Sequence, residues 1–325
     1  MNTEFRTPVA PLTRKGLISH ATPLLLLGSC FASNIGARLQ RDMFDVTVNP
    51  FGTLYNPASI AAACGRIAAG THFTEDDIVE GNGCLHSWHC HSSLSAKTHD
   101  RGEYLSTLNR LVDRMQADMC NIGVAILTFG TRHVYRLNSN GMVVANCHKF
   151  PAAEFDELDM DVEQCTGCIE KAIAALRSIN PDMRIVLTVS PVRYVGEGLH
   201  NSALSKSTLL IACDSVCTRY EGVIYFPSYE IMMDDLRDYR FYASDMKHPS
   251  DVAVDYIYSI FSESFFDSHT VEISDRCRRL SARLAHRSLS GQPDERFEKQ
   301  TCEIAERLIA EHPELTDVVN KILPR

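Results

Sequence analysis

The sequence predicts an α/β protein in which five parallel strands form a central sheet with helices on both faces. The first observation is that short, continuous apolar runs recur along the chain, as expected of strands buried on both faces of a sheet. The second is that a helix-like stretch follows each run, so that the order strand–helix repeats five times. Such alternation is typical of a three-layer, doubly wound α/β/α fold, and we expect the flavodoxin-like strand order.

The expected strands are runs of leucine, isoleucine and valine that end at a turn rich in Gly, Pro or Ser. Within them apolar and polar residues do not alternate, so neither face of the sheet is expected to contact solvent. The runs are Pro23–Gly28, Phe44–Val48, Val124–Gly130, Arg184–Ser190 and Gly222–Pro227.

The expected helices lie between these runs, where apolar residues recur at the three- and four-residue spacing of one helix face. One more helix follows the last strand. The helices are Asn34–Asp42, Pro57–Ala68, Tyr104–Asp118, Val162–Ser178, Ser205–Arg219 and Ser250–Ser264.

Two segments do not follow the alternation. Residues 71–100 are too polar for a core element and are expected to form a loop. After a domain of residues 1–266, the chain becomes polar and helical. Residues 267–325 are therefore expected to form a C-terminal helical extension, which Gly291-Gln292-Pro293 divides into two helices. This extension either packs on the sheet domain or joins two subunits as a homo-oligomer.

Composition excludes several classes of protein. The chain has 325 residues, of which 45% are apolar and 22% charged, as in an ordinary folded domain and unlike a disordered chain. A formal net charge of −9 argues against a nucleic-acid partner, because that affinity needs a basic surface. No apolar run has the roughly 20 residues of a membrane span, and the N-terminus has no secretory pattern. We therefore expect a cytoplasmic protein without a membrane partner.

Two cysteine pairs have spacings similar to those of zinc ligands, Cys165 with Cys168 and Cys213 with Cys217. Each pair falls within a predicted helix, whereas structural zinc sites usually place their ligands on turns. We therefore expect reduced thiols that pack as small apolar residues. The sequence indicates neither a metal nor a cofactor.

Residues of chemical interest follow several of the predicted strands. Gly28-Ser29-Cys30 comes after the first strand, Gly130-Thr131 after the third and Asp245-x-x-His248 after the fifth. Since ligands of open α/β sheets bind outside the carboxyl ends of the strands, these groups are expected to meet at one edge. An aspartate three residues before a histidine can accept a hydrogen bond from Nδ1. The other ring nitrogen, Nε2, can then take a proton from a hydroxyl or thiol.

Six stretches of the chain resemble a known family. The sequences LLLLGSCFASNIG, NPFGTLYNP, ILTFGTRHVYR, VVANCHK, VLTVSPVR and FYASDMKHPS look like those of the GSCFA family, which is grouped with the SGNH (GDSL-type) hydrolases. The resemblance runs from about residue 5 to residue 265. It implies an SGNH-hydrolase-like three-layer fold and ester or acyl chemistry.

The resemblance also implies roles for individual residues. When the chain is laid without gaps against the Gly-Asp-Ser turn of the superfamily, Cys30 stands at the nucleophile and Ser29 at the aspartate. His248 would be the base, and Asp245 would orient it. We favour Cys30 as the nucleophile, because a helix N-terminus beside an imidazole favours the thiolate. Two alternatives stay open: Ser29 is the nucleophile, or Ser29 caps the helix and Cys30 is a buried thiol.

The oxyanion hole departs most from the pattern of the superfamily. Gly52 resembles the oxyanion-hole glycine after the second strand, and Gly130-Thr131 resembles the following motif. The asparagine of that motif is absent. Asn56, Thr131 or a backbone amide would therefore have to donate to the oxyanion.

Residues 84–91 form a histidine-rich stretch. It contains Trp88, the one tryptophan of the chain, together with His86, His89 and His91. We interpret Trp88, His89 and His91 as a substrate-binding lid or cleft wall, since binding residues often lie on loops of a rigid scaffold. A plain surface loop and a metal site are the alternatives, although the spacing follows no established zinc pattern.

Three further residues are candidates for substrate contacts. Arg132 and Arg193 each follow a strand, and two arginines in the cleft would suit a carboxylate or phosphate. Pairing with acidic neighbours is the alternative for both. His148, within the family-like VVANCHK, is interpreted as a polar group of the cleft, with ordinary loop hydrogen bonding as its alternative.

Together these residues predict an SGNH-like hydrolase that acts on ester bonds through a covalent acyl-enzyme. The expected substrate is a small-molecule or glycan ester. An O-acyltransferase that acts on a carbohydrate would differ only in the second step, in which an acceptor replaces water. A non-catalytic module that binds a glycan or an acylated ligand is the third interpretation.

Overall fold

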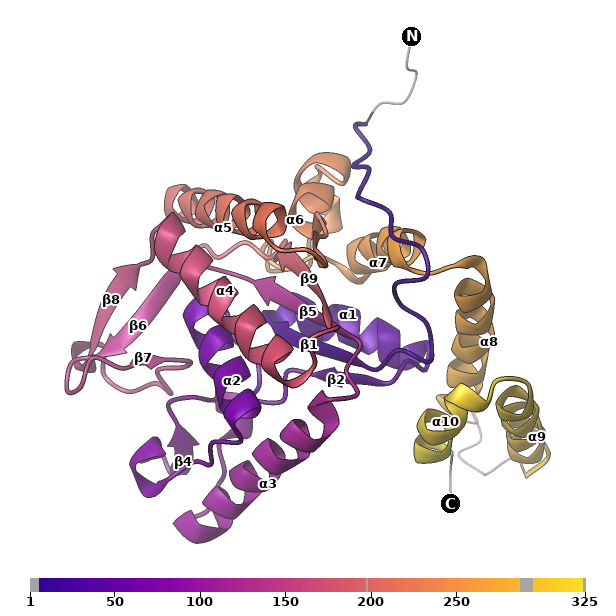
Figure 1. The fold of residues 1–325 in the computed structure, drawn as a ribbon, viewed down its shortest axis with the longest axis horizontal. Helices are drawn as coiled ribbons and strands as arrows, with labels where there is room; N and C mark the ends of the chain where they lie inside the picture. The colour runs from indigo at the N-terminus through magenta and orange to yellow at the C-terminus, as the bar shows by residue number, and fades with distance from the viewer. Residues whose placement is uncertain (1–5, 197, 287–294, 324–325) are drawn as a thin grey trace.

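A computed structural model describes residues 6–196, 198–286 and 295–323 (Figure 1). Its centre is a five-stranded sheet in the order β10-β9-β5-β1-β2, in which all neighbouring strands are parallel. The α/β prediction is therefore confirmed, and the strand order is the flavodoxin-like one. The strands are β1 (Leu24–Gly28), β2 (Val46–Val48), β5 (Val124–Phe129), β9 (Arg184–Val189) and β10 (Val223–Tyr225).

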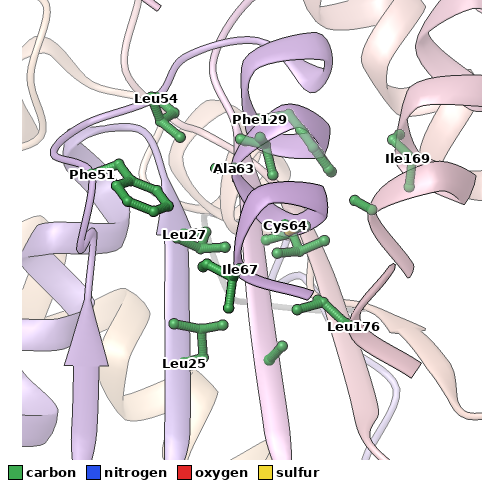
Figure 2. Close-up of a cluster of buried hydrophobic side chains, with 14 of the residues drawn as sticks. Leu25, Leu27, Phe51, Leu54, Ala63, Cys64, Ile67, Phe129, Ile169 and Leu176 are labelled. Carbon is green, nitrogen blue, oxygen red and sulfur yellow. The ribbon is translucent and has the colours of Figure 1, made fainter. Parts of the chain in front are cut away.

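Helices cover both faces of this sheet, so that the domain has three layers. Leu25 and Leu27 of β1 lie in the apolar core on one face, beside Cys64 and Ile67 of the covering helix (Figure 2). The leucines that alternate with them lie in the core on the other face, which explains the unbroken apolar run. The helices of the first face are α2 (Pro57–Ala69), α3 (Arg101–Met119), α4 (Val162–Ile179) and α5 (Leu199–Arg219), and those of the second are α1 (Cys30–Arg41) and α7 (Asp251–Phe265).

Three of the helices begin earlier than their apolar spacing predicted. α3 begins at Arg101 instead of Tyr104, because Asp100 is its N-cap. α1 begins at Cys30 instead of Asn34, because Ser29 is its N-cap. α5 begins at Leu199 instead of Ser205, directly after Gly198. The first turn of α5 carries few core residues, so a prediction based on spacing starts too late there, whereas the first turn of α1 contributes Phe31 and Ala32 to the core.

Two small antiparallel sheets lie outside the central sheet, one within residues 71–100, where we expected a loop, and one in residues 133–159, for which we had predicted no element. Their strands are short, and several of their side chains are exposed, so that the pairing partner decides the conformation more than the sequence of the strand does. One sheet pairs β3 (Ile78–Gly81) with β4 (Cys84–Ser87), and in the other β6 (His133–Leu137) lies between β7 (Val143–Val144) and β8 (Phe155–Asp159).

The C-terminal helices form a small bundle beside the sheet domain, on the side away from β6 and β8 (Figure 1). Their apolar core, which includes Ile273, also takes in Met43 of the sheet domain. Arg278 donates to the fully buried Asp42. The extension therefore packs on the sheet domain, one of the two arrangements that we expected. The helices are α8 (Ser268–Leu284), α9 (Glu295–Glu311) and α10 (Thr316–Ile322). The predicted break at Gly291-Gln292-Pro293 lies outside the described residues.

The paired cysteines of α4 and α5 belong to the core. Cys165 and Cys213 are fully buried, and Cys168 and Cys217 pack against the same cluster. In the described part of the chain, no group of three or more His, Cys, Asp or Glu side chains is arranged to hold a metal ion. None of the helices described there combines the length and the apolar composition that crossing a bilayer requires.

Candidate functional site

A cavity of about 550 Å³ lies at the carboxyl edge of the central sheet. Residues that follow β1, β2, β5, β9 and β10 line it, and so do residues around β6 and β7. Among the predicted site residues on its wall are Ser29, Cys30, Asn56, Arg193 and His248. The fold therefore brings to one place residues from the beginning and the end of the sheet domain.

The turn between β1 and α1 is held by backbone hydrogen bonds. Gly28 has φ +141°, and a Cβ there would lie 2.1 Å from the carbonyl oxygen of Thr128 on β5, so only glycine fits. The Gly28 N–H donates to Asn49 Oδ1 at 2.8 Å, and the Ser29 N–H donates to Thr128 O at 3.0 Å. These contacts hold the backbone of the turn and thereby position the side chains of Ser29 and Cys30.

Ser29 is the N-cap of α1. Its Oγ accepts a hydrogen bond from the Phe31 N–H at 3.3 Å, and the residue is 1% exposed. The hydroxyl therefore accepts from one of the free N–H groups in the first turn of the helix, although Ser29 also lies on the cavity wall.

Cys30 is the first residue of α1 and lines the cavity while partly exposed. Burial raises the pKa of its thiol. The N–H groups of Cys30 and Phe31 and the charge of Lys206 act in the opposite direction and favour the thiolate. Burial outweighs these three groups, so the pKa of the partly exposed Cys30 thiol stays above its usual value, and its reaction depends on a base that takes the proton.

Lys206 is a functional candidate that our sequence analysis missed. Its ammonium group is buried and donates to the carbonyl oxygens of Gly130 and Ser190, both at 2.7 Å. These carbonyls follow β5 and β9, so the lysine holds the ends of two strands together beside the cavity. Burial lowers the pKa of Lys206 to about 7, against the attraction of the Cys30 thiolate. Its position on the buried face of α5, three residues before Leu209, was a usable signal.

Asp245 and His248 form the predicted pair. His248 Nδ1 and Asp245 Oδ2 are 2.6 Å apart, and Asp245 Oδ1 accepts from the N–H groups of Lys247 and His248 at 2.9 and 3.0 Å. These hydrogen bonds hold the pKa of the Asp245 carboxyl well below its usual range. His248 lines the cavity, and its Nε2 has no partner among the described residues, so this nitrogen is available to a substrate or a nucleophile.

Most of the chain matches the model of one protein family. The model of the GSCFA family matches residues 23–261, which include both the turn after β1 and the Asp245–His248 pair. The chain belongs to the GSCFA family. A search of the curated proteins finds no match to it.

In this GSCFA protein the predicted oxyanion-hole residues have other hydrogen-bond partners. The Gly52 N–H donates to Asn49 O at 2.8 Å, and Gly52 is not part of the cavity wall. The N–H groups of Gly130 and Thr131 both donate to Tyr55 O, at 2.7 and 3.0 Å. The geometry therefore does not support these three glycine and threonine amides as oxyanion donors.

Asn56 has a side-chain amide that can donate to a ligand in the cavity. It is the N-cap of α2, where its Oδ1 accepts from the Ser59 N–H at 2.8 Å. That bond fixes the orientation of the side chain on the cavity wall. Among the described residues nothing accepts from its Nδ2, so this amide and the nearby Cys30 N–H can donate to a ligand.

The histidine-rich stretch of the GSCFA protein packs against the small sheets and does not line the cavity. Trp88 is 8% exposed and packs against Phe150 and Phe155. His89 Nε2 contacts Asp77 at 2.8 Å, and His91 caps a short turn by accepting from Ser93. The interpretation of Trp88, His89 and His91 as a lid is therefore corrected, because the packing and hydrogen bonds of these side chains lie elsewhere.

The two arginines that we considered for the cleft differ in position. Arg132 donates to Asp159 at 3.0 Å and is not part of the cavity wall, so its alternative interpretation as the partner of an acidic neighbour is correct. Arg193 lines the cavity. His148 lines it too, and its Nε2 is 2.9 Å from the carbonyl oxygen of Ser87, which requires a proton on that nitrogen. Burial lowers the pKa of His148 to about 4, so the ring is neutral.

Proposed function

We propose that this GSCFA protein hydrolyses ester bonds through a covalent acyl-enzyme on Cys30. The observation that carries the proposal is the shared cavity wall: a thiol at a helix N-terminus and an imidazole oriented by a carboxylate line the same cavity. A cavity of about 550 Å³ is of the size that takes a small-molecule ligand.

Two differences between the neighbouring side chains favour Cys30 over Ser29 as the nucleophile. Ser29 is almost completely buried, and its hydroxyl accepts the capping hydrogen bond of α1. Cys30 is partly exposed and has amide N–H groups and the Lys206 charge beside it. A thiolate is also the stronger nucleophile at neutral pH.

In the first step the Cys30 sulfur attacks the carbonyl carbon of the ester, and its proton passes to His248 Nε2. The tetrahedral oxyanion accepts hydrogen bonds from Asn56 Nδ2 and the Cys30 N–H, donors of a kind that each contribute roughly 100-fold or more to the rate. The C–O bond then breaks, and the alcohol leaves with the proton from His248. In the second step His248 takes a proton from water, which attacks the thioester and restores the thiol. Asp245 keeps the ring of His248 in the orientation that both steps need.

The test compares the variants Cys30→Ala and Ser29→Ala with the wild-type protein on 4-nitrophenyl acetate and on an acetyl thioester. Cys30→Ala is expected to lower kcat/KM by about 1,000-fold and to abolish the acetylated form in mass spectrometry. Ser29→Ala should retain activity, with some loss of stability from the missing cap. Cys147→Ala is the matched control, because Cys147 lines the same cavity but burial raises the pKa of its thiol to about 11.

Other outcomes of this test have definite meanings. Full activity in both Cys30→Ala and Ser29→Ala would exclude the covalent mechanism. A wild-type rate no higher than that of the His248→Ala variant would leave only a binding module for glycans or acylated ligands. Acetyl transfer to an added carbohydrate, faster than release to water, would replace the hydrolase by an O-acyltransferase.

A further inference from the structure

The wall of the cavity differs in charge from the rest of the molecule. The chain as a whole is acidic, with 41 Asp and Glu against 32 Lys and Arg. Among the described residues that line the cavity there is no Asp or Glu, whereas Lys149, Arg193 and Lys247 all lie on its wall. A concave surface of this kind attracts anions against the net charge of the protein.

Arg193 is the best-fixed of these cations. Its Nη1 donates to the phenol oxygen of Tyr239 at 3.3 Å, and the guanidinium lies 5.8 and 5.6 Å from the ring centroids of Tyr239 and Tyr242. Its backbone N–H donates to Lys247 O at 3.1 Å, which ties it to the loop of the catalytic His248. Aromatic rings and a phenol position the guanidinium, but they do not neutralise it.

In the part of the chain that the structure describes, no carboxylate pairs with Arg193. Arg132 differs in this respect, because its guanidinium binds Asp159 at 3.0 Å outside the cavity. Lys149 and Lys247 likewise form no ion pair with a described residue, and both are exposed at the cavity. Arg193 therefore brings to the cavity wall a guanidinium that two tyrosines position and that no described carboxylate neutralises.

We propose that the ester substrate carries an anionic group, a carboxylate or a phosphate, that binds Arg193 and is attracted by Lys247. This inference rests on the proposed hydrolase function and names the class of its substrate. The anionic group lies on the side of the cavity that is formed by the residues following β9. The charged end of the substrate stays on the guanidinium while its ester carbonyl reaches Cys30.

The kinetic test uses three matched aryl acetates: 3-acetoxybenzoate, its methyl ester and 3-acetoxyphenyl phosphate. In the wild-type protein at least one of the two anions is expected to have a kcat/KM about tenfold or more above that of the methyl ester. A higher kcat/KM for 3-acetoxybenzoate indicates a carboxylate substrate, and a higher kcat/KM for 3-acetoxyphenyl phosphate indicates a phosphate. In Arg193→Gln the ratio of anion to methyl ester is expected to fall close to one.

The control variant is Arg240→Gln, which removes one positive charge from the residue next to Tyr239, the partner of Arg193. Arg240 is exposed, packs over Phe241 and does not line the cavity. Its ratio of anion to methyl ester should remain that of the wild-type protein. Equal kcat/KM values for all three acetates in the wild-type protein, or an unchanged ratio in Arg193→Gln, would overturn the proposal.

A binding measurement separates this inference from the hydrolase function. Calorimetric titration of the wild-type protein with benzoate, phenyl phosphate and benzamide needs no reaction. Binding of an anion that Arg193→Gln weakens about tenfold or more supports the anion site even if no acetate is cleaved. Cleavage of the acetates without any difference between anions and benzamide in binding would leave the hydrolase standing and exclude the anion site.

Discussion

Two regions of the molecule contain most of the side chains with catalytic or metal-binding chemistry. In one region these side chains line a cavity, and in the other they pack against or bond to their neighbours. The strand-end cavity gathers Cys30, Asn56, Arg193 and His248 from four separate loops. The histidine-rich stretch, residues 84–91, holds its histidines close together in sequence, but each finds its partner nearby. The first region is a cavity, and the second is the packed edge of a small core.

The difference shows that residue type alone does not identify a site. His89 has a hydrogen bond to Asp77, just as His248 has one to Asp245. His248 lies beside the carboxyl ends of the parallel strands, where the sheet leaves a crevice and the helices begin. Trp88 and His89 lie in the turn after β4, beside an antiparallel hairpin that has no such crevice, so their side chains fill space or form local hydrogen bonds.

The largest expected effect concerns the histidine of the cavity. His248→Ala removes the base and the acid, and should lower kcat/KM for 4-nitrophenyl acetate by about 1,000-fold. Asp245→Asn should cause a smaller loss, because the ring remains but its orientation and tautomer are less fixed. Steady-state kinetics measure both. His91→Gln, in the other region, should stay within about twofold of the wild-type rate, and an equal loss there would remove the distinction between the two regions.

A medium effect is expected for the buried lysine beneath the cavity. The charge of Lys206 favours the Cys30 thiolate, so Lys206→Met should slow the reaction of Cys30 with iodoacetamide at pH values where the lysine is protonated. Because burial brings the pKa of Lys206 to about 7, the lysine loses its proton as the pH rises above 7. The difference between the two proteins should therefore be largest near or below pH 7 and shrink above it.

The measurement is the alkylation rate of Cys30 against pH, with Cys147 in the same protein as the internal reference. A merely structural role of Lys206 would lower the unfolding temperature without shifting the pH profile. An unchanged profile for Cys30 would therefore show that the lysine only connects the ends of β5 and β9.

The smallest effect on activity is expected for the tryptophan of the histidine-rich stretch. Trp88→Ala removes a large buried ring from a small core and should lower the free energy of unfolding by about 3 kcal/mol. Denaturant titration measures this loss of stability. At low temperature, where the variant is still folded, its kcat/KM should stay within about threefold of the wild-type value. A selective loss of kcat/KM in a fully folded Trp88→Phe protein would restore the interpretation as a lid.

Much of the fold could be predicted from local patterns. The apolar runs identify all five central strands, because a strand buried on both faces needs apolar residues throughout. The strands of the small sheets could not be found in this way, since β8, with the sequence FDELD, has four exposed residues out of five. Its strand conformation comes from pairing with β6, which lies far away in the sequence.

The candidate site was predictable where its geometry is local. Gly28, Ser29 and Cys30 form one turn, and Asp245 reaches His248 within three residues. The candidate oxyanion donors could not be chosen from the sequence, because a backbone N–H that looks available there finds an acceptor only when loops meet. Gly130 and Thr131 donate to Tyr55 O, which comes from the loop after a different strand.

The sequence by itself determined the alternation of strands and helices and the Asp245–His248 pair, since both depend on contacts between near neighbours or on burial along one strand. Only the tertiary structure decided which charged groups face the cavity. The register of β6 against β8 pairs His133 with Asp159, and this brings a carboxylate to Arg132 while Arg193 keeps none among the described residues. Lys206 enters the site for the same reason: its two carbonyl acceptors come from different strands, and packing of α5 brings it to both.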